Sequence, residues 1–326
     1  MRSIHRFGQF LLALAFVGIA AGVQAQGYPS RAVRLVVADS AGGAPDQLAR
    51  LVAQKMSESL GAQVIVDNRA GAGGALGADL VAKSPPDGYT LLMTTTAIYA
   101  ILPNLRKDLP YDPVRDFVPV GRIATASNVL VINNAVPARD VAELVRYAKE
   151  RPGALNYASA GIGTPAHLAG EMLNLLADIK VVHVPYKGAA PALLDVIAGN
   201  AQYIITSPIA AGAHMSAGRV RAIATTGTER NPALPDLPTV ADTLPGYDIT
   251  QSWGIVAPAG TPPDVAKRLG DELVKALANA EVRDKILKTG AVPASDDTPA
   301  AFADFMAKER ARLGDVIARS KIELKE

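Results

Sequence analysis

A strand, a glycine-rich turn and a helix start follow one another in Val33-Arg34-Leu35-Val36-Val37-Ala38-Asp39-Ser40-Ala41-Gly42-Gly43-Ala44-Pro45-Asp46. The β-branched apolar run is typical of a buried strand, and an amphipathic stretch begins at Asp46. The same order returns in Leu155-Asn156-Tyr157-Ala158-Ser159-Ala160-Gly161-Ile162-Gly163-Thr164-Pro165. Both stretches therefore predict the strand–turn–helix corner of an α/β protein.

The two turns also predict a binding site. The start of a helix offers unpaired backbone N–H groups and the positive end of the helix dipole, and glycine lets a ligand approach them closely. Two such helix starts in one chain predict a clamp for an anion that is formed largely without Lys or Arg.

Strand-like and helix-like segments alternate along the chain. Strands are expected at residues 34–38, 64–66, 89–93, 128–132, 155–158, 181–184, 203–206 and 221–225. Helices are expected at 46–60, 76–83, 138–151, 165–176, 189–199, 264–278, 281–289 and 299–319. This alternation predicts an α/β fold whose sheets are mainly parallel and flanked by helices.

The chain is long enough for two lobes. The helices after residue 258 need a sheet to cover, and the sheet of the first segment is the natural candidate. We therefore expect a discontinuous first lobe of residues 26–124 and 226–326, and a second lobe of residues 125–225. Two crossing segments between the lobes would form a hinge, and the cleft between the lobes would hold a ligand.

Residues 1–25 have the pattern of a signal peptide. Arg2, His5 and Arg6 are basic, the run from Phe10 to Val23 is apolar, and Val23-Gln24-Ala25 gives a small-x-small cleavage site. We expect cleavage after Ala25 and a periplasmic location, with an uncleaved anchor as the alternative.

Composition excludes several classes of function. The chain has 33 Lys and Arg against 31 Asp and Glu, and removing Arg2 and Arg6 with the signal peptide leaves 31 of each. Basic runs with interleaved aromatic residues are lacking, so nucleic-acid binding is not expected. The chain has no cysteine, which excludes thiol catalysis, zinc–thiolate sites and iron–sulfur clusters.

Several segments together carry a family resemblance. They are Gly42-Gly43 with Asp46-Gln47-Leu48-Ala49-Arg50, Val66-Asp67-Asn68-Arg69-Ala70-Gly71-Ala72-Gly73-Gly74, Pro86-Asp87-Gly88-Tyr89-Thr90-Leu91, Ser159-Ala160-Gly161-Ile162-Gly163-Thr164, His183-Val184-Pro185-Tyr186-Lys187-Gly188, Leu237-Pro238-Thr239-Val240 and Ala257-Pro258-Ala259-Gly260-Thr261-Pro262. In this order and spacing they resemble the tripartite tricarboxylate transporter receptor (Bug) family of periplasmic solute-binding proteins.

The resemblance implies a two-lobed, type II periplasmic-binding-protein fold that closes around a small carboxylate. It also implies delivery of that carboxylate to the membrane components of a tripartite tricarboxylate-type transporter, with no cofactor, and a monomer is expected. In the family, loops of the two lobes pinch one carboxylate of the ligand. Those loops correspond here to residues 41–46 and 159–164.

The first loop departs from the family pattern. Ala38-Asp39-Ser40-Ala41 stand where the family has proline, an aromatic residue, a small residue or proline, and proline, and Pro45 replaces a hydroxyl residue. Leu102-Pro103 stands where Asn-Pro is common. If Asp39 faces the cleft, it would repel a second carboxylate and favour an ammonium or hydroxyl group on the ligand. The alternative is that Asp39 points into solvent or caps the following turn.

Twelve residues are candidates for ligand contact. They are Asp39, Ala41, Gly42, Gly43, Ala44, Asp46, Thr95, Ser159, Gly161, Gly163, Thr164 and Trp253. Helix capping is an alternative role for Asp46 and Thr164, and core packing is one for Trp253. His167, His183 and His214 have no metal-ligand spacing, so no metal site is predicted. His167 would support the second loop from behind.

The function expected from the sequence is that of an exported, non-catalytic receptor for an organic acid. Dicarboxylates, tricarboxylates, amino acids and aromatic acids are all within the range of the family, and Asp39 favours a monocarboxylate or an amino acid. The alternative is a sensory protein that presents its ligand to a histidine kinase. An enzyme is not expected, because no nucleophile–base–orienter set is present.

Overall fold

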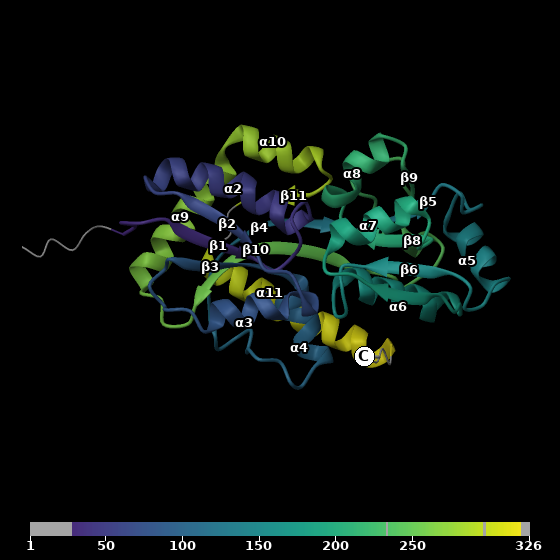
Figure 1. Cartoon of the computed structure of the whole chain (residues 1–326), viewed down its shortest axis with the longest axis horizontal. Coiled ribbons are helices and arrows are strands. Elements are labelled where there is room, and N and C mark those ends of the chain that lie inside the picture. Colours follow the sequence, from purple (N-terminus) through teal and green to yellow (C-terminus); the bar gives the residue numbers. More distant parts are fainter. Residues whose placement is uncertain (1–27, 233, 296–297, 321–326) are drawn as a thin grey trace, which may run out of the picture.

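Two β-sheets, each flanked by helices, form the two lobes of the molecule (Figure 1). The computed structural model describes residues 28–232, 234–295 and 298–320. The predicted signal peptide lies outside these residues. The six-stranded sheet of the first lobe contains, in spatial order, β11 (Val292–Pro293), β4 (Phe117–Ser127), β10 (Thr250–Pro258), β3 (Thr90–Thr95), β1 (Val33–Val37) and β2 (Val64–Asn68). The five-stranded sheet of the second lobe contains β7 (Val182–Pro185), β6 (Asn156–Ser159), β8 (Tyr203–Thr206), β5 (Val129–Asn133) and β9 (Val220–Thr225).

Helices cover both faces of each sheet. Those of the first lobe are α2 (Ala44–Leu60), α3 (Ala75–Ala82), α4 (Leu102–Leu105), α9 (Pro263–Ala278), α10 (Ala280–Lys288) and α11 (Pro299–Ser320), with the short turns η1 (Ala72–Gly74) and η2 (Ala97–Ile101). Those of the second lobe are α5 (Val141–Lys149), α6 (Pro165–Ala177), α7 (Ala189–Ala198) and α8 (Pro208–Ser216); η3 (Val240–Asp242) lies between β9 and β10. None of the helices described is both long and apolar enough to cross a membrane.

The two-lobed α/β fold is confirmed, but the sheets are mixed rather than mainly parallel. β1 pairs in parallel with β2 and β3, whereas β10 runs antiparallel to both β3 and β4. In the second sheet β6 is parallel to β7 and β8, and β5 is antiparallel to β8 and β9. The chain leaves the first lobe along β4 and returns along β10, so these neighbouring strands must run in opposite directions.

Side chains of the strands alternate between two cores in each lobe. Leu35 and Val37 of β1 pack with α2, α9 and α10, whereas Val36 packs on the other face with α3 and Phe302 of α11. In the second lobe, Leu130 faces α5 and α6, and Val131 faces α7 and α8. Each sheet is therefore buried on both faces, and its strand ends are the edges left for a site.

The two chain crossings between the lobes are joined to each other at Asn128 and Thr226. The N–H of Asn128 donates to Oγ1 of Thr226 at 2.8 Å, and the N–H of Thr226 donates to the carbonyl of Asn128 at 2.9 Å. Both side chains are fully buried. β4 pairs with β10 as far as Ser127, within the first sheet. The division of the chain at residues 124 and 226 stays a prediction.

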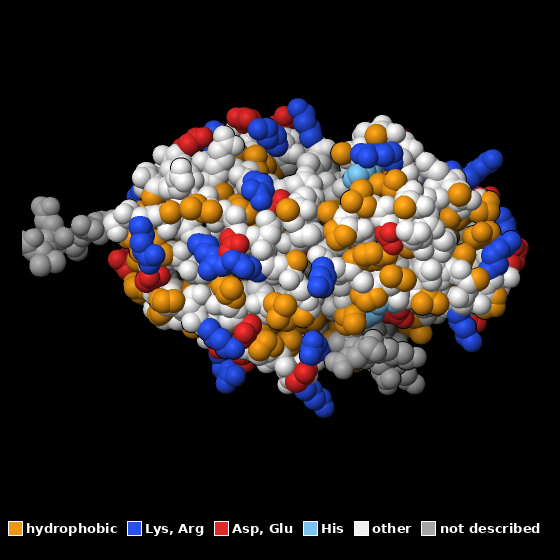
Figure 2. Space-filling view, in the orientation of Figure 1, with side chains coloured by type: hydrophobic (Ala, Val, Ile, Leu, Met, Phe, Trp, Pro, Cys, Tyr) orange, Lys and Arg blue, Asp and Glu red, His pale blue; other side chains and the backbone are white. Residues whose placement is uncertain are grey.

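Helix α11 packs against both lobes. Phe302 near its start lies in a core of the first lobe, and Leu313 and Ile317 near its end lie in a core of the second. Figure 1 shows this helix, in yellow, passing from one lobe toward the other. On the face drawn in Figure 2, basic and acidic side chains are interspersed over both lobes. Ion pairs at the surface of the molecule include Arg31 with Asp87 at 2.9 Å.

Candidate functional site

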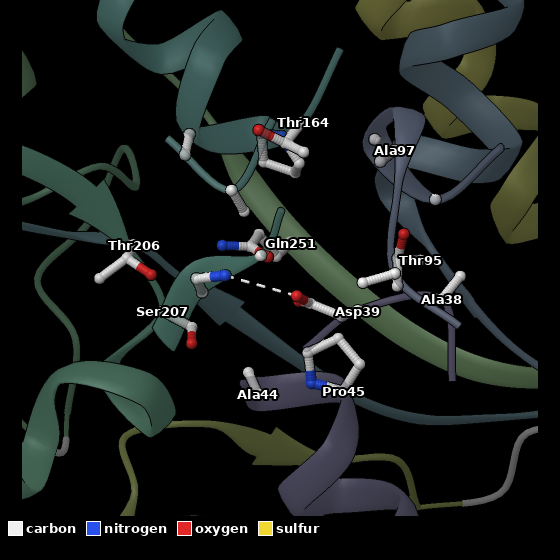
Figure 3. A pocket seen from close by; sticks show the side chains of 18 of the residues that line it. Ala38, Asp39, Ala44, Pro45, Thr95, Ala97, Thr164, Thr206, Ser207 and Gln251 are labelled. Atoms are coloured by element: carbon white, nitrogen blue, oxygen red, sulfur yellow. Dashed lines mark hydrogen bonds between the residues drawn. The ribbon is translucent and has the colours of Figure 1, made fainter. Parts of the chain in front are cut away.

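A cavity of about 60 Å³ lies between the two lobes (Figure 3). Its walls come from loops that follow strands of both sheets. The lining residues are Ala38, Asp39, Ala44, Pro45, Ala70, Gly71, Gly73, Gly74, Thr95, Ala97, Ala160, Thr164, Pro165, Ala166, Lys187, Gly188, Ala189, Thr206, Ser207, Gln251 and Trp253. Most are small, so main-chain groups form much of the wall.

The starts of four helices, α2, α6, α7 and α8, contribute to this wall. Each helix follows a strand directly, and these strands are β1, β6, β7 and β8. The carboxyl ends of strands are where open α/β sheets bind ligands, because the following helices direct their N–H groups and positive dipole ends there. The sequence predicted the contributions of α2 and α6, and the structure adds α7 and α8.

The first predicted turn contributes Asp39 and Ala44 to the wall, whereas Ala41, Gly42, Gly43 and Asp46 lie outside the lining. Oδ2 of Asp46 accepts the N–H of Gly42 at 2.9 Å, and its carboxylate pairs with Arg50 at 2.9 Å. Burial opposes ionisation of Asp46, but hydrogen bonds from Arg50 and Gly42 hold its pKa below the usual range. Asp46 thus closes the turn before α2, although no side-chain hydrogen bond caps the helix itself.

The second turn contributes Thr164, whereas Ser159, Gly161 and Gly163 lie outside the lining. Oγ1 of Thr164 donates to the carbonyl of Gly161 at 2.7 Å and accepts the N–H of His167 at 3.4 Å. Thr164 therefore caps α6 and borders the cavity at once. Oγ of Ser159 lies 2.6 Å from Nε2 of His183, behind the loop.

Two stacked histidines support this turn. The rings of His167 and His183 are 4.2 Å apart, and Nδ1 of His167 accepts the N–H of Gly163 at 3.2 Å. Burial lowers the pKa of His167 to about 4, and burial together with the neighbouring His167 lowers that of His183 to about 3. Both rings are therefore neutral at pH 7, which the role of Nδ1 as an acceptor requires.

Asp39 reaches from the first lobe to the second. Its Oδ1 accepts the N–H of Ser40 at 2.7 Å and, more weakly, the N–H of Ala189 at 3.4 Å, which is the first residue of α7 (Figure 3). Gly188 has a φ of +126°, and a Cβ there would lie 2.5 Å from Oδ1 of Asp39. Burial raises the pKa of Asp39 to about 6, against the lowering effect of these hydrogen bonds.

The lobes also approach closely beside the cavity. A Cβ on Gly73 of the first lobe would lie 2.3 Å from the carbonyl oxygen of Ile162 in the second. A Cβ on Gly163 would lie 2.2 Å from a methyl group of Leu102. These glycines let the two walls meet, so the structure represents a closed arrangement of the lobes.

Thr95 and Trp253 both line the cavity, and their contact with a ligand stays a prediction. Trp253 is 1% exposed and belongs to a core of the first lobe, so it also packs as the alternative expected. Gln251 was missed, and its Nε2 donates to Oδ1 of Asn128 at the crossing between the lobes. Lys187 also lines the cavity and is exposed.

Other lining residues were also not among the candidates, and four of them lie at the starts of α7 and α8: Gly188, Ala189, Thr206 and Ser207. The signals were present, because Gly188 precedes a helical segment and Ser207-Pro208 is a helix-start pattern. Ser207 caps α8 by accepting the N–H of Ala210 at 3.1 Å. Within the described ranges, no three metal-ligating side chains of His, Cys, Asp or Glu come together.

Comparison with known proteins gives consistent matches along the chain. The model for "Tripartite tricarboxylate transporter family receptor" matches residues 48–322. A "UPF0065 protein in tcbD-tcbE intergenic region" of Pseudomonas sp. (strain P51) is 40% identical over 297 residues, which is 90% of this chain and 88% of that protein. Protein BugT of Bordetella pertussis is 34% identical over 314 residues, or 96% of each chain.

Solved structures match over similar lengths. Rpa4515 of R. palustris, solved with adipate, has a TM-score of 0.87 and 35% identity, covering 91% of this chain and 99% of its own. MatC (Rpa3494) of Rhodopseudomonas palustris, solved with bound malate, has a TM-score of 0.86 and 31% identity, covering 89% and 100%. The periplasmic binding protein BugD has a TM-score of 0.88 and 31% identity, covering 91% and 99%.

Proposed function

Since this chain belongs to the tripartite tricarboxylate transporter family of receptors, we propose that it binds a small organic carboxylate between its lobes and delivers it to the membrane components of such a transporter. The related receptors Rpa4515 and MatC have been solved with adipate and malate, which are both carboxylates. The proposal extends that ligand chemistry to this chain.

The convergence of four helix starts on one cavity is the observation that carries the proposal. Unpaired N–H groups and the positive dipole ends favour an anion there. Lys187 is the one Lys or Arg among the lining residues, and it is exposed. A flat carboxylate, which accepts several hydrogen bonds at short range, fits a wall made of main-chain donors and small side chains.

Movement of the lobes would load and release the ligand. The crossings at Asn128 and Thr226 are two short segments that can act as a hinge, while the cavity wall draws on both lobes. A ligand that contacts both walls stabilises the closed arrangement, because it binds that arrangement more tightly than the open one. The closed form is then the form that the membrane components recognise in the periplasm.

Isothermal titration and thermal unfolding of the mature protein, residues 26–326, test the binding step. The panel contains monocarboxylates, dicarboxylates, tricarboxylates and amino acids. For each acid, the amide that replaces its carboxylate is tested as the uncharged control. A ligand at about 1,000 times its Kd should stabilise the folded state by about 4 kcal/mol. Binding of one acid and not of its amide supports the proposal. Absence of binding by every acid, in protein first stripped of ligand by unfolding and refolding, contradicts it.

Uptake by cells tests the delivery step separately. Cells that lack this protein should lose uptake of the acid that binds in the titration, and the intact gene should restore it. Uptake that continues unchanged would contradict delivery while leaving binding in place.

A further inference from the structure

The cavity contains two charged side chains of opposite sign. Asp39 and Lys187 are the charged residues of its lining. Lys187 is exposed, whereas Asp39 is half-buried between the lobes. The rest of the wall is formed by small residues, hydroxyl groups, Gln251 and Trp253. The helix starts alone provide the N–H donors and positive dipole ends that a simple anion needs. They do not explain why an acidic side chain, Asp39, lines the same cavity.

Asp39 has no counter-charge in the part of the chain that the structure describes. No Lys, Arg or His there lies within 4.0 Å of its carboxylate, in contrast to Asp46, whose carboxylate pairs with Arg50 at 2.9 Å. Its raised pKa, about 6, expresses the same lack of a cationic partner in a desolvated place. A partly buried carboxylate is stabilised by a cationic partner, and since no described residue supplies one, a cationic group of the ligand would stabilise Asp39.

The two carboxylate oxygens of Asp39 differ in the hydrogen bonds that they accept. Oδ1 already accepts the N–H groups of Ser40 and Ala189, at 2.7 and 3.4 Å. No described residue donates a hydrogen bond to Oδ2. Oδ2 lies close to Gly43, where an added Cβ would be 3.1 Å from it. Oδ2 is therefore the oxygen of Asp39 that is left to accept a donor from the ligand.

The position of Oδ1 also determines where a ligand carboxylate can bind. The first N–H of α7 is occupied by Asp39, so a second carboxylate at this end would stand beside a like charge. The start of α2 is also beside this charge, because its N-cap Gly43 lies against Oδ2, whereas the starts of α6 and α8 have no acidic side chain in the lining. The carboxylate of the ligand belongs at the starts of α6 and α8, and a hydrogen-bonding cation belongs at Asp39.

We propose that Asp39 makes this receptor selective for ligands that carry an ammonium group together with the carboxylate, that is, for an amino acid over the acid without its amino group. This inference rests on the proposed function, since it assumes that a carboxylate binds in the same cavity. The ammonium group donates to Oδ2 of Asp39, and the carboxylate accepts from the starts of α6 and α8.

Matched pairs of ligands test the inference by isothermal titration. The pairs are alanine and propionate, aspartate and succinate, glutamate and glutarate, and phenylalanine and 3-phenylpropionate, with lactate and malate as hydroxyl-bearing probes. In the pair that binds best, the amino acid should bind at least about tenfold more tightly than its partner, as expected for a charge-assisted hydrogen bond. Lactate and malate, whose hydroxyl group can donate to Oδ2 but carries no charge, should bind more weakly than the corresponding amino acids.

The variant Asp39→Asn keeps the shape of the side chain and removes its charge. It should reduce the tenfold preference for the amino acid to about threefold or less. The variant Asp39→Ala removes the carboxylate without adding an amide, and it should reduce this preference in the same way. The control Asp304→Asn makes the identical change at an exposed residue of α11 and should keep the preference. Thermal unfolding confirms that each variant is folded.

The outcomes are distinct. Equal or tighter binding of the plain or hydroxyl-bearing acid, or a preference that survives both Asp39 variants, would overturn the inference while leaving the carboxylate receptor intact. Absence of binding by every acid and every amino acid would overturn the proposed function, and this inference with it.

Discussion

The main-chain N–H of Gly163 donates to Nδ1 of His167 at 3.2 Å. The bond joins the cavity loop to the first turn of α6, and the ring of His167 is 4% exposed and stacked on His183. An imidazole can accept at Nδ1 only while that nitrogen is unprotonated. The conformation of the loop thus depends on a neutral histidine that lies behind it.

Replacement of His167 by leucine should destabilise the protein and weaken binding. The N–H of Gly163 would lose its acceptor, and a buried, unpaired donor costs about 1–3 kcal/mol. The variant His167→Asn offers an amide oxygen in a similar place and should recover part of the loss. Urea unfolding of both variants measures the difference. Equal stability of the leucine variant and the unchanged protein would mean that the hydrogen bond from Gly163 does not contribute to folding stability.

Folding stability should decrease as the pH falls from about 6.5 toward 5. His167 and His183 have folded-state pKa values of about 4 and 3, below the usual value of 6.5 that applies to the unfolded chain. In this window the unfolded state binds more protons, so stability rises with pH by up to about 2.7 kcal/mol per pH unit for two histidines. Asp39 opposes part of this effect, since its folded-state pKa is raised.

Chemical unfolding at several pH values measures this dependence. The variant His183→Gln keeps a partner for Oγ of Ser159 and does not titrate, so its stability should vary less with pH. A dependence as steep as that of the unchanged protein would show that His183 is not one of the groups responsible.

The substitution Gly73→Ala should impair closure of the lobes. Gly73 has a φ of +65°, and an added Cβ would lie 2.3 Å from the carbonyl oxygen of Ile162 across the cleft. We expect binding of the preferred acid to weaken at least about tenfold. The left-handed conformation itself costs alanine about 1–2 kcal/mol, whether the lobes are open or closed.

Gly61→Ala is the matched control for that experiment. Gly61 has a φ of +70°, and a Cβ there would meet nothing within 4 Å. Both variants should lose similar stability, while only Gly73→Ala should lose affinity. Small-angle scattering with ligand present should give a larger radius of gyration for Gly73→Ala. Unchanged affinity of Gly73→Ala would mean that the ligand-bound form does not bring Gly73 against Ile162 as in this structure.

The variant Asp39→Asn should be more stable than the unchanged protein at pH 8. The folded-state pKa of Asp39, about 6, is above the model-compound value of 3.8, so ionisation of the buried carboxyl opposes folding as the pH rises. A shift of this size corresponds to about 1–3 kcal/mol. The gain should be present above pH 6 and absent near pH 4, where the carboxyl is protonated in the folded state. A variant less stable than the unchanged protein at pH 8 would contradict this account.

Much of the fold could be predicted from local patterns. The strands before the two glycine-rich turns are confirmed as β1 and β6, and the helices after them as α2 and α6. The long strands β4 and β10 were not predicted; β4 includes Pro119 and Gly121, which are unfavourable in a strand pattern. They became strands by pairing with each other over their whole length. The prediction of mainly parallel sheets was wrong, since β4 and β10 carry the chain out of the first sheet and back, and β5 runs antiparallel to β8 and β9 in the second sheet.

The candidate site was predicted less completely than the fold. Asp39, Ala44, Thr95, Thr164 and Trp253 line the cavity, whereas the other seven candidates lie outside the lining. Glycines such as Gly42 and Gly163, with φ values of +82° and +76°, shape the turns without facing the cavity. A sequence motif marks the conformation of a loop, but it does not indicate which of its side chains point inward.

The sequence by itself determined the two strand–turn–helix corners, because β-branched strands, glycines that adopt positive φ and prolines in the first helical turn act within a few residues. Only the tertiary structure decided that α7 and α8 join the same cavity, and that Asp39 meets Ala189, which lies 150 residues away along the chain. Such a contact depends on how two separately packed lobes close on each other, and no local pattern of side chains records that geometry.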